Sequence, residues 1–151
     1  MADVLHTNPS DWKYVSEGRE TVVFSYVGPP HPEFEGRVLR LKKTSASSDS
    51  ESDDDPTIEF QRKCIERLIP LQYLPRLGTV VLDRVWLEAF VALHESVRPE
   101  KRREKGAINL ERKKGVLVTD LVGGNWLAVE IKVSFSYFVL QLVLSTPKKF
   151  L

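Results

Sequence analysis

The amino-acid sequence predicts an α+β domain in which an antiparallel sheet of about five strands packs with two helices. Three observations lead to this prediction. Short runs of β-branched and aromatic residues lie between residues 12 and 42, and again between 116 and 131. Two stretches of helical periodicity, each preceded by an aspartate, separate these groups of strands. With 42% hydrophobic residues, 151 residues can form a core, as one domain or as part of one.

The first group of strands is predicted from residues 12–15, 21–27 and 36–42. The first run is interrupted at residues 16–18, and the third alternates apolar with charged residues in the period of two that marks a strand. Three antiparallel strands in about thirty residues indicate a small twisted sheet. Residues 1–11 are a polar lead-in.

Residues 44–55 are a low-complexity acidic segment that lacks any apolar residue larger than alanine. Such a segment cannot join a core, so we predict a disordered, mobile surface loop. An alternative is a phosphorylated acidic segment, because three serines each have an acidic residue three positions later: Ser48, Ser50 and Ser52.

Two helices are predicted after this loop. Asp55 caps the first, with Pro56 in its first turn, and Pro70 ends it. A short strand at 79–82 follows, and Asp83 caps the second helix, which runs to about residue 96. One face of the first helix carries Phe60, Cys64, Ile65 and Leu68, and one face of the second carries Trp86, Phe90, Val91 and His94. We interpret His94 as a structural histidine.

Polar residues end the two apolar runs near the carboxyl end of the chain. The run at 116–119 leads to Asp120, and after a turn at 123–125 a strand at 127–131 carries Glu130 and is followed by Lys132. Two adjacent β segments with Asp, Glu and Lys can form the floor of a polar pocket. The charged loop before them belongs to residues 98–114, which hold eight Lys or Arg, so a polyanionic ligand is compatible with the overall charge of +1.

The hairpin loop at residues 17–21 and Arg40 are the remaining candidates for chemistry. A hairpin of this kind can place backbone N–H groups over nucleotide phosphates, although one glycine in a hairpin is usually only a turn. Arg40 lies on the third strand, where a guanidinium can bind phosphate oxygens bidentately. An exposed strand cation is the alternative interpretation of Arg40.

Three segments together resemble the inositol-pentakisphosphate 2-kinase family, with a fungal-like sequence. They are Glu17-Gly18-Arg19-Glu20-Thr21, Val38-Leu39-Arg40-Leu41-Lys42 and Glu130-Ile131-Lys132. The last begins the family signature Glu-x-Lys-Pro-Lys, which Val133 and Ser134 then interrupt. The resemblance covers residues 12–132 and implies a kinase-like N-lobe whose second lobe is missing.

The resemblance implies an ATP-dependent kinase that uses Mg²⁺ and phosphorylates inositol 1,3,4,5,6-pentakisphosphate at position 2, giving the hexakisphosphate, phytate. The residues it implies for ATP binding are Gly18, Arg19, Glu20, Thr21, Arg40, Asp120 and Glu130. Arg98, Arg102 and Lys132 are implied for the inositol phosphate, the two arginines through an Arg-Pro-x-x-Arg segment. The catalytic base and the metal ligands are expected in the missing lobe, so no residue here is assigned to them and this chain is expected to be inactive alone.

Residues 133–151 form an apolar tail unlike the family. We interpret it as translated intron sequence, because a valine codon begins with the GT that also begins most introns. A truncated family member and a different protein that shares the rest are the alternatives. The longest apolar run, 133–144, is shorter than the roughly 20 residues of a membrane span.

Composition limits the remaining classes of function. Cys64 is the only cysteine, which excludes an intramolecular disulfide and a cysteine-rich zinc site, and the three histidines are too scattered for a metal cluster. We expect an intracellular monomer in the nucleus or cytoplasm. The sequence has neither the Gly-x-Gly-x-x-Gly turn of a dinucleotide-binding domain nor the aromatic-basic face of a nucleic-acid-binding one, which argues against both functions. A non-enzymatic α+β binding or regulatory module is the alternative to the kinase.

Overall fold

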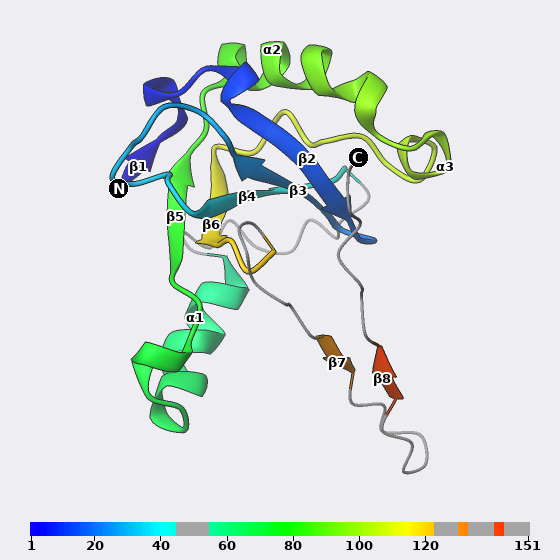
Figure 1. The fold of residues 1–151 in the computed structure, drawn as a ribbon. Helices are drawn as coiled ribbons and strands as arrows, with labels where there is room; N and C mark the ends of the chain where they lie inside the picture. The colour runs from blue at the N-terminus through cyan, green and yellow to red at the C-terminus, as the bar shows by residue number, and fades with distance from the viewer. Residues whose placement is uncertain (45–54, 123–129, 133–140, 144–151) are drawn as a thin grey trace, which may run out of the picture. The chain divides into compact units, whose positions relative to one another are not determined.

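The computed structural model describes residues 1–44, 55–122, 130–132 and 141–143 (Figure 1). The chain divides into a unit Met1–Asp120 and a unit Leu121–Leu151, each of which is described by itself. Several predictions fall outside the described residues: the character of the acidic loop at 45–54, the first part of the strand at 127–131, and most of the tail after residue 132.

A six-stranded sheet forms the first unit, which confirms the predicted α+β class. Its order is β1-β5-β6-β4-β3-β2, and every neighbouring pair is antiparallel except β1 with β5, so the sheet is mixed. The strands are β1 (Ala2–Asp3), β2 (Trp12–Glu17), β3 (Thr21–Tyr26), β4 (Arg37–Lys42), β5 (Leu77–Val81) and β6 (Lys114–Thr119). The sequence predicted about five strands; the additional one is the two-residue β1, within the segment interpreted as a polar lead-in.

Three α-helices accompany the sheet: α1 (Pro56–Lys63), α2 (Arg84–His94) and α3 (Glu100–Arg103). Both predicted caps are present, because Asp55 Oδ1 accepts a hydrogen bond from Thr57 N at 2.8 Å and Asp83 Oδ1 accepts one from Trp86 N at 2.8 Å. Short 3₁₀ turns occupy Val4–His6, Pro9–Asp11, Ile65–Arg67, Leu71–Tyr73 and Glu95–Val97. None of the helices in the described part of the chain has the length and apolar character to cross a membrane.

The two predicted helices differ in how they pack. Helix α2 lies along the sheet in Figure 1 and buries Trp86, Leu87, Phe90 and His94. Helix α1 has no buried residue, and Phe60 on its predicted apolar face is 57% exposed. The sequence therefore predicted where α1 begins, whereas only α2 packs as a core helix.

Aromatic rings join α2 to the sheet. Phe90 lies between Phe24 of β3 and Trp86, with ring centroids 4.6 and 4.8 Å away. His94 Nε2 lies 2.9 Å from Pro9 O, which agrees with a structural role for this histidine. These contacts place the main hydrophobic core on the face of the sheet that α2 covers.

The second unit contains two short strands, β7 (Glu130–Lys132) and β8 (Gln141–Val143), which pair antiparallel. In this pair Glu130 is opposite Val143 and Lys132 is opposite Gln141. β7 matches the end of the strand predicted at 127–131.

Candidate functional site

The face of the sheet opposite α2 is apolar in its centre. Side chains alternate between the two faces along a strand, and the register pairs Val23 of β3 with Arg40 of β4 and Arg40 with Val116 of β6. Val38 and Val116 are buried, yet neither belongs to the core cluster under α2. This second face therefore presents a strip of valines in which Arg40 is set.

Arg40 is the cation in the middle of this strip. Its side chain is half-buried, and the strands β3 and β6 flank it on both sides. Within the described part of the chain, no carboxylate forms an ion pair with Arg40. Among the residues that the structure describes, none accepts a hydrogen bond from this guanidinium, and phosphate oxygens are the partners that its N–H donors bind best.

One end of the strip carries a carboxylate. Ser25 Oγ donates a hydrogen bond to Asp120 Oδ2, and Asp120 N donates one to Gly36 O at 2.8 Å. Ser25 pairs with Val38 at the end of β3, so Asp120 lies where the strip of valines ends. Its oxygens are hydrogen-bond acceptors beside an apolar surface.

The other end carries the hairpin loop that the sequence singled out. Thr21 begins β3, and Gly18 N donates to Thr21 O at 2.9 Å, which closes a tight turn between β2 and β3. Residues 18–20 are exposed. A Cβ on Gly18 would meet nothing within 4 Å, and its φ is not positive, so packing within the protein gives no reason for glycine at this position.

The loop and Asp120 lie at opposite ends of the same strand. Ser25 lies four residues after Thr21, which is about 13 Å at roughly 3.3 Å per residue. An apolar strip of this length, with acceptor oxygens at one end and a glycine turn at the other, fits a flat base followed by a chain of phosphates. Arg40 lies between the two ends.

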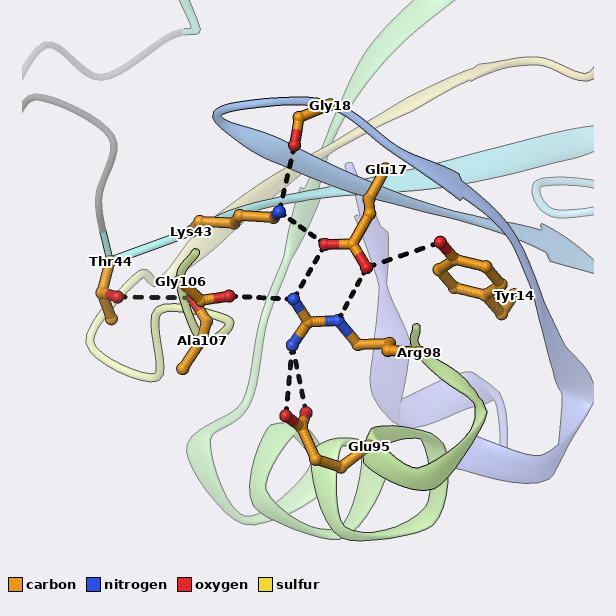
Figure 2. A network of polar contacts seen from close by, with 9 residues as sticks. All are labelled: Tyr14, Glu17, Gly18, Lys43, Thr44, Glu95, Arg98, Gly106 and Ala107. Atoms are coloured by element: carbon orange, nitrogen blue, oxygen red, sulfur yellow. Dashed lines mark hydrogen bonds and ion pairs between the residues drawn. The ribbon is translucent and has the colours of Figure 1, made fainter. Parts of the chain in front are cut away.

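Behind the loop lies a network of buried charges that the sequence did not predict (Figure 2). Glu17 Oε2 is 2.5 Å from Lys43 Nζ and 2.8 Å from Arg98 Nη2, and Arg98 Nε donates to Glu17 Oε1 at 3.2 Å. The side chains of all three residues are at most 1% exposed. Arg98 Nη1 donates to Glu95, with the shorter contact at 3.1 Å, and Arg98 Nη2 donates to Gly106 O at 2.8 Å.

The network keeps its members charged. Burial by itself raises the pKa of Glu17, but hydrogen bonds from Arg98 and Lys43 outweigh burial, so this pKa lies below its ordinary value. Burial by itself lowers the pKa of Arg98, while Glu17 and Glu95 raise it further than burial lowers it. Both groups are therefore ionised throughout the neutral range.

The structure distributes the other predicted residues over four places. Arg19 and Glu20 are exposed in the loop beside Gly18, and Glu20 O accepts a hydrogen bond from Lys43 N at 2.8 Å. Arg102 is exposed on α3. Arg98 is interior, with its donors directed at the protein. Glu130 and Lys132 lie on β7 of the second unit, where the structure describes the backbone and not the side chains.

Glu17, Lys43 and Glu95 are the network residues to which the sequence assigned no role, although Glu17 begins the loop segment that carries the resemblance. A signal for Lys43 was present, because Leu39, Leu41 and Lys43 share the period-two face that points into the core. Glu95 had no comparable signal. Among the described residues, no group of three or more His, Cys, Asp or Glu side chains could hold a metal ion, so none of them is assigned as a Mg²⁺ ligand.

Comparison with known proteins supplies the context for this geometry. A family model described as inositol-pentakisphosphate 2-kinase matches residues 14–133. Two curated relatives, each named inositol-pentakisphosphate 2-kinase and each from a strain of Cryptococcus neoformans var. neoformans serotype D, are 32% identical over 142 residues. The alignment covers 87% of this chain and 34% of each relative, so the chain spans about a third of the length of these relatives.

Proposed function

Because the chain belongs to the inositol-pentakisphosphate 2-kinase family, we propose that it is the nucleotide-binding part of an ATP-dependent inositol kinase. The reaction transfers the γ-phosphoryl group of ATP to position 2 of inositol 1,3,4,5,6-pentakisphosphate and gives the hexakisphosphate. The observation that carries this proposal is the valine strip on the sheet face opposite α2, with Arg40 in its centre, Asp120 at one end and the Gly18 loop at the other.

The proposed pose of ATP follows from the polarity of the strip. The purine lies against the valines, where apolar contact stabilises a flat ring. Asp120 and Ser25 lie at the base end, where the carboxylate can accept a hydrogen bond from an exocyclic amine. The phosphates extend toward Thr21, and the donors are Arg40 and the backbone amides of residues 19 and 20, since the Gly18 amide is already bonded to Thr21 O. Glu130 of the second unit stays a proposed ligand on the nucleotide side.

The acceptor requires a separate set of cations. Five phosphate groups need several fixed donors, each making a charge-assisted hydrogen bond. Arg102 is exposed on a helix that is rich in basic side chains, and we assign it to the acceptor together with Lys132 of the signature segment. The donors of Arg98 already bind Glu17, Glu95 and Gly106, which supports a positioning role for Arg98 in place of direct phosphate contact.

Phosphoryl transfer by this chain alone is not expected. The reaction needs nucleotide, acceptor, metal and base held in line, and Mg²⁺, when bound, neutralises charge on the phosphates. The described residues supply groups for the nucleotide and for part of the acceptor. We therefore propose that the 151-residue chain forms no measurable hexakisphosphate from ATP, magnesium and the pentakisphosphate; product above a no-protein control would contradict this. A non-enzymatic binding module is not favoured by the family.

Calorimetric titration of the chain with ATP tests the nucleotide assignment. Arg40→Ala removes one charge-assisted phosphate contact, which is worth about 1.5–3 kcal/mol, so ATP affinity should fall by about 10-fold to 150-fold. Arg84→Ala is the matched control, because Arg84 is an arginine of the same unit that is exposed on α2 and pairs with Glu88 and Glu111. Equal ATP affinity of the two variants would remove Arg40 from the site, and no ATP binding by the wild-type chain would contradict the proposed function.

A further inference from the structure

Arg98 joins three parts of the chain that are far apart in sequence. Its guanidinium contacts Glu17 at the end of β2, Glu95 in the turn that follows α2, and the carbonyl of Gly106 (Figure 2). The contact with Gly106 also closes the segment 98–106 on itself, because Arg98 begins that segment and Gly106 ends it. One side chain therefore fixes the base of the Gly18 loop and both ends of the basic segment.

The guanidinium has no capacity left for a ligand. Arginine carries five N–H donors, on Nε, Nη1 and Nη2. All three nitrogens of Arg98 donate to protein oxygens, and the side chain is buried. A phosphate could bind Arg98 only by displacing Glu17, Glu95 or the Gly106 carbonyl, and displacing Glu17 would deprive a buried carboxylate of one of its two cationic partners.

Lys43 extends the anchor into the loop itself. Its ammonium group lies 2.5 Å from Glu17 Oε2 and donates to Gly18 O at 3.0 Å. Its backbone N–H donates to Glu20 O at 2.8 Å. The loop is thus held at the residue before it, at its glycine and at its last residue, while its own side chains stay exposed.

The Gly18 loop and the basic segment 98–106 meet at Arg98, and both have exposed residues that are held in place by buried ones. Residues 18–20 are exposed above Glu17, and residues 100–105 are exposed between the two contacts of Arg98. The bidentate contact between Arg98 and Glu17 defines both a distance and an orientation, since the guanidinium is a planar fork. A shift of one segment must therefore strain the ion pair that holds the other.

We infer that Arg98 is a positioning residue that couples the Gly18 loop to the basic segment 98–106. This inference rests on the proposed function, in which a nucleoside triphosphate binds at the loop and a polyphosphorylated inositol binds at the basic segment through Arg102. When the phosphates of a bound ligand order one of the two segments, Arg98 and Glu17 transmit that ordering to the other segment. Such coupling is reciprocal, so each ligand increases the affinity for the other by the same factor.

Amide hydrogen exchange on the 151-residue chain without ligand is the first test. The reporters are the amide of Gly18, bonded to Thr21 O, and the amides of residues 102–106, bonded within the basic segment. Arg98→Lys keeps the charge and loses the fork, so exchange at both sets of reporters should accelerate together by about tenfold or more. Arg84→Lys is the matched control on α2, and exchange at both sets should stay at the wild-type rate.

Three results would overturn the inference in this first test. One is acceleration at a single segment in Arg98→Lys. Another is equal behaviour of Arg98→Lys and Arg84→Lys. Glu17→Gln is the second variant, which removes the carboxylate charge at nearly constant size and should release the same two segments. Loss of protection throughout β3 and β4 in both variants is the third contrary result, because the network would then stabilise the whole sheet without a specific effect on the loops.

Addition of inositol pentakisphosphate separates this inference from the proposed function. In the wild-type chain the pentakisphosphate should slow exchange at residues 102–106 and, through Arg98, at Gly18; in Arg98→Lys only the first effect should remain. Slowing at 102–106 without any effect at Gly18 in the wild-type chain would overturn the coupling. If the pentakisphosphate slows neither segment while the ligand-free result holds, acceptor binding by this chain is refuted and the positioning role of Arg98 stands.

Discussion

Replacing Arg98 with methionine should lower the free energy of unfolding by about 3 kcal/mol. Removing one partner of a buried ion pair costs about 3–5 kcal/mol, because the other charge is left in the interior without compensation. Glu17 would keep Lys43 at 2.5 Å, so the lower end of this range is expected. Methionine fills much of the volume of the arginine stem, so the substitution leaves little cavity. The decrease in unfolding free energy therefore measures mainly the lost charge and hydrogen bonds.

Urea unfolding followed by tryptophan fluorescence measures this loss, since Trp12 and Trp86 are buried in the core beside α2. Arg84→Met is the matched control: Arg84 also pairs with two glutamates, but its side chain is 59% exposed. A surface pair contributes about 0–1 kcal/mol, so this variant should remain within 1 kcal/mol of the wild-type chain. The slope of the urea dependence should be the same in all three proteins.

The result that would refute the reasoning is a difference of less than about 1 kcal/mol between Arg98→Met and Arg84→Met. It would mean that solvent reaches Glu17 and screens its charge, or that Lys43 alone satisfies it. In either case Arg98 would not be needed to hold the loop at residues 18–20, and the inference about Arg98 would lose its energetic basis.

Three further predictions follow from the same structure. The pKa of Glu17 lies below its ordinary value of 4.5, so its stabilising contribution is complete above about pH 4.5 and is lost as the pH falls through the folded-state pKa; Glu17→Gln should therefore flatten the acid limb of a plot of unfolding free energy against pH. Asp83→Ala removes the cap that accepts from Trp86 N and should cost about 1 kcal/mol in urea unfolding, whereas Asp83→Asn should cost much less. Gly28→Ala would place a Cβ 2.6 Å from Asp11 Cβ and should lower the thermal midpoint, at a cost of about 1–3 kcal/mol, while Gly78→Ala meets nothing within 4 Å and should leave the midpoint unchanged or higher.

Local patterns predicted most of the elements of the fold. The strands expected at 12–15, 21–27 and 36–42 are β2, β3 and β4, and the helix expected from Asp83 is α2. Each of these has a signal within a few residues, either a period of two or a capping aspartate. β1 has only two residues, too few to show a period, and its pairing with β5 depends on a contact about 80 residues away.

Packing was less predictable because it depends on partners outside the local window. The apolar face of α1 has the right period, but the sequence does not state what would cover it, and Phe60 is exposed. For Arg98 the local sequence is misleading in the opposite direction, because it indicates exposure where the structure shows burial. Its place in a basic run suggests an exposed cation, and its burial follows from Glu17, which lies 81 positions away. Family resemblance pointed to Arg98 and Arg102 alike, whereas the buried position of Arg98 and the exposed position of Arg102 are seen only in the structure.

Stability alone does not explain why three charged side chains are buried behind the loop. Replacing a buried ion pair by apolar residues of similar size is often neutral or stabilising. An apolar cluster, however, has no preferred direction, whereas the fork of Arg98 on Glu17 and the contact of Lys43 with Gly18 O specify where the loop begins and how it is oriented. A loop that presents backbone donors to phosphate must hold them within a few tenths of an ångström, because charge-assisted bonds weaken steeply with misalignment. The charged network is therefore better accounted for by the position that it imposes on residues 18–20 than by the free energy that it adds to folding.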